Sequence, residues 1–176
     1  MKKSEIQPMP KFFDRYIQLV EEEDLFDALY KSQYVIEHLD IDVLQKIDRK
    51  VYAANKWTIH DIFQHIIDNE RIQSYRALWF ARGANNDKLP GYDEDLFANH
   101  ANTSNRSLDE IIDELRVLRT STIQLFHSFE TATLKNIGTC FNIEISVLGL
   151  GFMMVGHQIH HLNVIKERYE PLVKNS

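Results

Sequence analysis

The stretch KWTIHDIFQHIIDNERIQSYRALWFARG, residues 56 to 83, predicts a long amphipathic helix and with it the class of the fold. Its apolar side chains recur at intervals of three and four residues, the period of one helix face. Thr58 and Asp61 resemble a capping box in which Asp replaces the usual Glu or Gln, and Gly83 is a typical helix stop. We predict a helix over 58–82. The apolar positions are Ile59, Ile62, Phe63, Ile66, Ile67 and Ile72.

Helical periodicity continues on both sides of this stretch. Upstream, a region of about 12–39 predicts one helix, or two pieces separated by the acidic run EEED. Downstream, Ser107 and Glu110 form a second capping box, which opens a helix of about 107–130. A last helix is predicted over about 143–169.

Four amphipathic regions of this length predict an all-α fold, a four-helix bundle with one long crossover connection. The turn-rich stretch 83–106 is that crossover and could form one wall of a site. The segment TATLKNIGTCFN, residues 131–142, is predicted as a connector, with Asn142 as the cap of the last helix. No run of alternating apolar and polar residues predicts a strand.

The length of 176 residues predicts one domain with a core of its own. Residues 1–11 carry two prolines and no apolar run, so we expect them to form a flexible N-terminal tail. Residues 12–176 then form a single helical bundle domain.

Charge and composition exclude several function classes. The net charge of −6 argues against nucleic-acid binding, and no apolar stretch approaches the roughly 20 residues that span a membrane. The single cysteine, Cys140, excludes an intrachain disulfide and a multi-cysteine zinc cluster, and it fits a cytoplasmic location. Serine hydrolase and zincin motifs are absent from the sequence.

Three histidines near the end of the chain raise the question of a metal site. His157 and His161 lie four residues apart on the predicted last helix, which brings their Cβ atoms to about 6 Å on one face. With eight histidines in the chain, such a pair arises in roughly a third of random shuffles, so the spacing alone is weak. Two polar rings on a strongly apolar helix nevertheless need partners. His65, on the helix of 58–82, is available as a third ligand.

The order and spacing of Trp57, His65, Arg76, His157 and His161 resemble the DinB/YfiT superfamily of four-helix-bundle metalloproteins. The later GYD and the RVLR of the third predicted helix fit the same resemblance, which covers most of the chain from about residue 22. It implies one divalent metal ion, most often zinc or nickel. The implied ligands are His65, His157 and His161, with an open coordination position at one end of the bundle. A homodimer is also implied.

Three neutral histidines suit a catalytic zinc, because the open position lowers the pKa of a bound water toward 7 or accepts a substrate thiolate. The superfamily includes thiol-dependent S-transferases and isomerases. The resemblance therefore implies a metal-dependent enzyme of the thiol S-transferase or hydrolase type, acting on a small molecule such as a low-molecular-weight thiol. Since no general base is evident, a non-catalytic metal-binding module for stress response or dimerisation stays open.

Other polar residues could support this site. Asp61 and Asn69, four residues before and after His65, could orient that ring or a bound water, or could face solvent. His160 points about 100° away from its neighbour, so we expect it beside the site and not as a ligand. Arg76 lies about 16 Å along the helix from His65 and could bind the far end of an anionic substrate or pair with an acidic residue.

Overall fold

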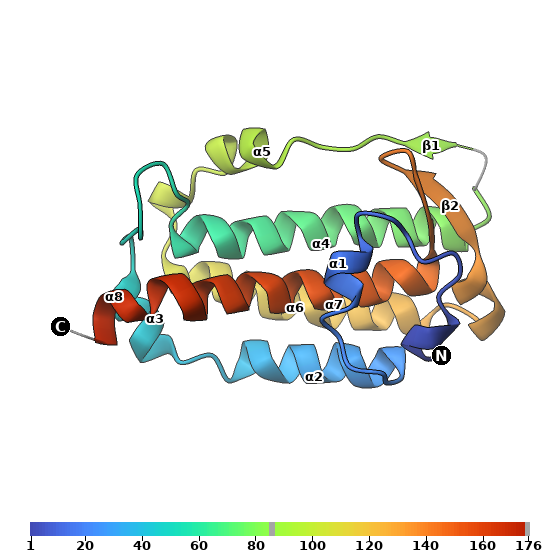
Figure 1. Ribbon diagram of the computed structural model, residues 1–176, viewed down its shortest axis with the longest axis horizontal. Helices are drawn as coiled ribbons and strands as arrows, with labels where there is room; N and C mark the ends of the chain where they lie inside the picture. The colour runs from blue at the N-terminus through green and yellow to red at the C-terminus, as the bar shows by residue number, and fades with distance from the viewer. Residues whose placement is uncertain (85–86, 175–176) are drawn as a thin grey trace.

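Four helices lie side by side along the molecule and form a bundle (Figure 1). The computed structural model describes residues 1–84 and 87–174. The predicted four-helix bundle is confirmed, and α4 is its longest helix at 23 residues. The bundle helices are α2 (Leu25–Glu37), α4 (Ile59–Ala81), α6 (Leu108–His127) and α7 (Val147–Val164).

The two capping boxes begin α4 and α6 where the sequence predicts. The Thr58 hydroxyl accepts a hydrogen bond from the Asp61 N–H at 3.3 Å, and the Asp61 carboxylate accepts one from the Thr58 N–H at 2.8 Å. The same exchange joins Ser107 and Glu110, at 3.2 and 2.8 Å. Each box satisfies backbone N–H groups that the first helical turn leaves without a partner.

Short elements connect the bundle helices. Residues Thr131–Lys135 form a 3₁₀ turn after α6, and a π-helical segment, Ile165–Tyr169, continues α7. Two more 3₁₀ turns lie at Lys3–Glu5 and Thr103–Asn105, and the short α-helices are α1 (Asp14–Ile17), α3 (Ile41–Ile47), α5 (Glu94–His100) and α8 (Pro171–Lys174). In Figure 1, the crossover carries α5 along the outer side of α4. Among the described residues, no helix combines the length and the apolar character needed to cross a membrane.

A small sheet at one end of the bundle corrects the predicted connector. β2 (Ile137–Cys140) pairs antiparallel with β3 (Ile143–Ser146), and β1 (Lys88–Leu89) of the crossover pairs parallel with β2. Phe141 and Asn142 form the hairpin turn with positive φ of 53° and 59°, as a tight turn with the twist of the strands requires.

The predicted start of the last helix is wrong for the same reason. Residues 143–146 are a strand, and α7 begins only at Val147. Its cap is the Ser146 hydroxyl, which accepts a hydrogen bond from the Gly149 N–H at 3.0 Å, and not Asn142. Asn142 is taken up by the hairpin turn instead.

The start of the chain packs against the bundle. Ile6 lies in the core at 4% exposure, and the N-terminal amine forms an ion pair with Asp24 at 2.5 Å. The region predicted over 12–39 forms two pieces, α1 and α2. The backbone of α1 approaches α7 so closely that a Cβ on Gly156 would lie 1.9 Å from the Tyr16 carbonyl oxygen. The division at residue 12 stays a prediction, but residues before it contribute to the core.

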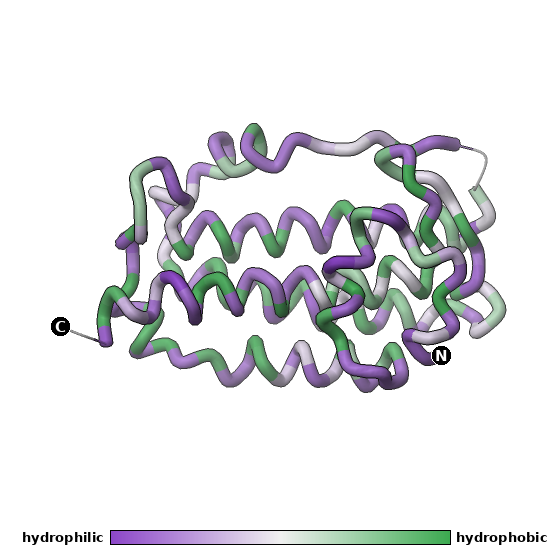
Figure 2. Tube along the Cα trace, viewed as in Figure 1, coloured by the Kyte–Doolittle hydropathy of each residue, from purple (hydrophilic) through white to green (hydrophobic). Residues whose placement is uncertain are grey.

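The interior consists of two apolar clusters with polar side chains between them. One cluster fills the end with the sheet and α1, and the other fills the end with α3 and α8. Figure 2 shows hydrophilic residues recurring along the bundle helices, including their middle sections. In this polar layer, Arg119 on α6 donates two hydrogen bonds to Glu70 on α4, at 2.9 and 2.8 Å. Both side chains are nearly inaccessible to solvent.

Candidate metal centre

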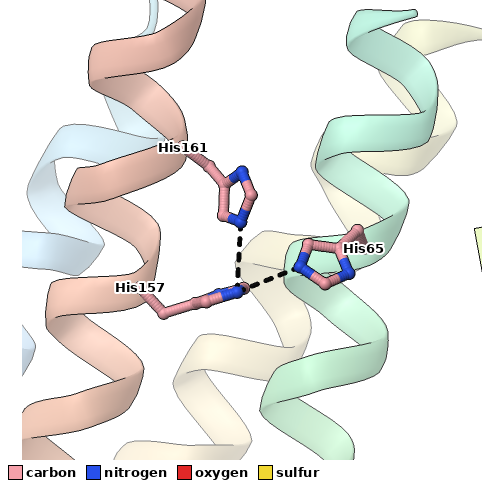
Figure 3. Close-up of side chains that lie close together, drawn as sticks. All are labelled: His65, His157 and His161. Atoms are coloured by element: carbon pink, nitrogen blue, oxygen red, sulfur yellow. Dashed lines mark hydrogen bonds between the residues drawn. The ribbon is translucent and has the colours of Figure 1, made fainter. Parts of the chain in front are cut away.

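The three histidines predicted as metal ligands come together between α4 and α7 (Figure 3). His157 points from α7 toward His65 on α4, and their Nε2 atoms lie 3.0 Å apart. The Nε2 atom of His161, one turn along α7, lies 3.1 Å from the Nε2 of His157. One nitrogen of each ring lies within 4.8 Å of the others. The helical spacing of four residues and the contact of α4 with α7 together produce this convergence.

The donor set fits a divalent ion. Two nitrogens at about 2.0–2.1 Å from a tetrahedral zinc lie about 3.3 Å apart, close to the two shorter separations here. Three imidazole nitrogens aimed at one point are an unusual way to satisfy buried rings, because each neutral ring has one donor and one acceptor nitrogen. An ion at that point would use the lone pair of all three.

The site holds its histidines in the neutral form that a metal requires. Burial, assisted by the nearby His160, lowers the pKa of His65 from 6.5 to about 4. Burial, with His65 and His160 adding to it, lowers the pKa of His161 to about 2. The pKa of His157, the most deeply buried ring, is held well below 6.5, first by burial and then by the neighbouring histidines and Arg15, which oppose a positive charge on this ring. No proton therefore has to leave these rings near pH 7 before an ion binds.

Aromatic rings enclose the cluster on two sides. The Trp57 ring lies 4.9 Å from the His65 ring, centroid to centroid, and the Tyr16 ring lies 5.1 Å from that of His157. These rings limit the access of water and keep the local dielectric low, which strengthens electrostatic interactions inside the site. The contribution of Tyr16 has no signal in the sequence, because α1 reaches the site only through its packing on α7.

The residues expected to support the ligands have other partners. Asp61 accepts hydrogen bonds from Thr58 and from the Thr103 hydroxyl, so its carboxylate serves the cap of α4. Asn69 donates to the Tyr92 hydroxyl at 2.8 Å. Within the described part of the chain, neither side chain bonds to a ring of the cluster, and their orienting roles stay predictions.

His160 lies beside the cluster and is not one of its converging ligands. Its ring packs edge-on against Tyr16, at 5.4 Å between centroids, and against His161, at 4.9 Å. This position agrees with the helical wheel, which turns His160 away from the face shared by His157 and His161.

A cavity of about 270 Å³ opens beside the cluster, with His157 in its wall. Residues of α1, α4, the crossover, the β2–β3 turn and α7 line it, so the crossover forms part of the wall of this cavity, and its role at a functional site stays a prediction. Those that supply polar groups near its interior are Tyr16, Asn69, Gln73, Arg76, Tyr92 and His157. The cavity places space for a small molecule beside His157.

Arg76 lines this cavity and pairs with no acidic residue of the helices that the structure describes. Its guanidinium donates to the Gln73 side-chain oxygen at 3.1 Å and to the Pro90 carbonyl at 2.6 Å. In residues 1–84 and 87–174, no carboxylate lies within 4.0 Å of it. The axial distance from His65 suggested a position remote from the site, but the cavity extends along α4 far enough to include Arg76.

Comparison with known proteins identifies the family and the fold of this chain. Residues 21–165 match the model of the DinB superfamily. Among solved structures, the chain is similar to YfiT from Bacillus subtilis, described as a probable metal-dependent hydrolase with an unusual four-helix bundle topology. The two are 17% identical, with a TM-score of 0.63 over 91% of this chain and 87% of YfiT, which shows a shared fold. No curated protein matches the sequence.

Proposed function

Because this chain belongs to the DinB superfamily, we propose that it is a metal-dependent enzyme acting on a small molecule. His65, His157 and His161 are the proposed ligands of one divalent ion, zinc or nickel. The observation that carries the proposal is the convergence of three neutral imidazoles, two of them buried and that of His161 partly buried, beside a cavity that His157 lines. A structural zinc is normally closed by four protein ligands, whereas three ligands leave a position for chemistry.

When bound, the ion would act as a Lewis acid that activates a water or a thiol at neutral pH. The chain's own groups perform the rest. His65, His157 and His161 would bind the ion from two helices, and the Trp57 and Tyr16 rings pack against His65 and His157. Fixed ligands on helices hold such a centre more precisely than ligands on loops.

Two reaction classes share this site. Hydrolysis is supported by the description of YfiT, which has the same fold. Transfer to or from a low-molecular-weight thiol is supported by the cavity, which admits a small molecule beside His157. A buried set of neutral nitrogen ligands suits either, since both need an activated nucleophile at one open position.

The experiment is turnover before and after metal removal. The protein would be stripped with chelator, reloaded with zinc or nickel, and assayed with a phenyl ester for hydrolysis and with glutathione, bacillithiol or mycothiol plus a chlorodinitrobenzene electrophile for transfer. We expect turnover in one assay that depends on metal and is lost in His161→Ala. His160→Ala, one residue away and outside the ligand set, is the matched control and should retain it.

Absence of turnover with every substrate, combined with a large loss of thermal stability on chelation, would contradict the proposal. Those two results together would favour a non-catalytic module in which the ion fixes α4 against α7.

A further inference from the structure

We propose that the cavity beside His157 contains a carboxylate-binding subsite built around Arg76, and that the substrate is a small carboxylate. This inference rests on the proposed function for the identity of the bound molecule as a substrate. The subsite itself depends only on residues of this chain that lie away from the three histidines.

The first observation is a buried positive charge without an ion pair. Arg76 is 3% exposed, and its two hydrogen bonds go to uncharged oxygens of Gln73 and Pro90. A buried charge is costly unless a charged partner compensates it. The same protein provides that partner elsewhere, since Arg119, fully buried, is bound at two points by Glu70. Arg76 lacks an equivalent carboxylate among the described residues, and an anionic ligand would supply one.

The second observation is an unused acceptor in the same wall. Asn69 is 7% exposed, and its side-chain oxygen has no hydrogen-bond partner in the described part of the chain, although its amide N–H group donates to Tyr92. Asn69, Gln73 and Arg76 follow one another at intervals of four and three residues, so they share one face of α4. A ligand bound along this face would meet a guanidinium and, about two turns away, a free acceptor for an N–H or O–H group.

The guanidinium has donors left for a carboxylate. Arginine carries five N–H groups in a planar fork, and Arg76 uses two of them within the described chain. A fork of this geometry binds a carboxylate at two points, which gives charge-assisted hydrogen bonds and a fixed orientation. Gln73 holds one edge of the fork in place at 3.1 Å, so it acts as a positioning residue.

Part of the cavity wall favours an apolar ligand body. Phe13 and Met153 contribute apolar surface to the wall, and both are part of the buried core. The volume of about 270 Å³ corresponds to roughly nine water volumes of about 30 Å³, room for a ligand of about ten non-hydrogen atoms. The expected ligand is therefore a short carboxylate whose other end faces His157.

Two aromatic residues with unusual backbones form the mouth of the cavity. Phe12 and Phe141 have positive φ of 74° and 53°, and their rings lie 5.7 Å apart, centroid to centroid. The φ of Phe141 belongs to the β2–β3 hairpin turn, whereas a positive φ at a bulky residue such as Phe12 is an outlier of the kind found at ligand clamps and active sites. Both side chains are about half exposed, which places them where a ligand enters.

Acidic residues at the mouth do not neutralise Arg76. Asp93 and Glu94 line the cavity but are exposed, and neither lies within 4.0 Å of the guanidinium. The Asp93 carboxylate accepts hydrogen bonds from the N–H groups of Asp95 and Leu96, both at 3.0 Å. The Asp93 carboxylate therefore caps α5. Water screens the charges of Asp93 and Glu94 at the exposed mouth more strongly than it screens the buried charge of Arg76.

The test uses pentanoate and its neutral, nearly isosteric amide, pentanamide, as probes in calorimetric titrations of the metal-free protein. We expect pentanoate to bind at least about tenfold more tightly than pentanamide, the effect of one charge-assisted pair. Gln73→Glu places a carboxylate beside Arg76 with little change in shape and should abolish this preference. Gln64→Glu is the matched control, because Gln64 on the same helix also accepts from an arginine, Arg106, but lies outside the cavity.

Equal affinity for pentanoate and pentanamide in the wild-type protein would refute the carboxylate subsite and would leave the proposed metal centre unaffected. Retention of the pentanoate preference in Gln73→Glu would also overturn the subsite. If the protein fails to hold a metal but keeps a Gln73-dependent preference for pentanoate, the subsite stands and the proposed function fails. In the zinc-loaded protein, 5-mercaptopentanoate should bind more tightly than pentanoate, because its thiol would reach the ion. If 5-mercaptopentanoate also binds more tightly than pentanoate in the metal-free protein, the placement of its thiol toward the histidines is wrong.

Discussion

Acid should destabilise the metal-free protein by protonating histidines that the fold keeps neutral, and His65 is the clearest case. Burial of this ring lowers its pKa from 6.5 to about 4 in the folded chain. Because the folded pKa lies below the unfolded value, the unfolded chain takes up a proton between pH 6.5 and pH 4 and the folded chain does not. Stability therefore falls as the pH falls through this window, and His65 has no such effect above it.

The magnitude follows from the width of that window. At pH 5, about 1.5 pH units below the unfolded pKa, His65 alone should lower the free energy of unfolding by about 2 kcal/mol. The pKa values of His157 and His161 are lowered in the same direction, so their effects have the same sign. A loss of this size is large against a typical total stability of about 5–15 kcal/mol.

Urea unfolding in the presence of chelator, at several pH values from 8 to 5, measures the effect. His65→Gln removes the titrating ring, so its loss of stability over this range should be smaller than the wild-type loss by about 2 kcal/mol. Ile66→Val, a buried neighbour, is the control, since it should cost about 1 kcal/mol at every pH. Equal pH dependence in His65→Gln and the wild type would refute the reasoning.

Three further predictions concern the scaffold. Arg119→Met leaves the Glu70 carboxylate buried without its partner and should cost about 3–5 kcal/mol in urea unfolding, whereas adding Glu70→Leu should recover most of that loss; no recovery would contradict this view of the pair. Gly156→Ala would bring a Cβ to 1.9 Å from the Tyr16 carbonyl oxygen, so α1 must move and Tm should fall by several degrees, and an unchanged Tm would show that the close approach is unimportant. The Cys140 thiol is buried, which raises its pKa, so an aromatic disulfide reagent should modify it only as fast as the protein opens; immediate reaction of the folded protein would contradict its burial.

The parts of the fold that the sequence predicts well are those with local causes. The capping boxes at Thr58 and Ser107 and the three- and four-residue apolar spacing determine where α4 and α6 begin. The strands β2 and β3 escaped prediction because each has four residues, too few for alternation to be recognised, and their pairing depends on a turn at Phe141. Phe is rare in that backbone conformation, so the turn carries no recognisable signal.

In the candidate site, too, features with local causes could be predicted and features that depend on tertiary packing could not. The pair His157 and His161 follows from helical spacing. His65 could be named as an available third ligand on another helix, but its approach to His157, 92 residues away, depends on the packing of α4 against α7, and the family resemblance added to that choice. The cavity could not be predicted, because Tyr16 and Tyr92 reach it from segments whose positions depend on tertiary packing. Arg76 could be placed on the correct face of its helix but not in a cavity.

The most direct test of the account is the metal content of the purified chain, measured by elemental analysis after reconstitution with zinc or nickel and removal of free ion. We expect about one ion per wild-type chain, about one in His160→Ala, and almost none in His157→Ala, because the Nε2 of His157 lies between those of the other two ligands. A wild-type protein that retains no ion, or a His157→Ala variant that retains a full one, would contradict the metal centre.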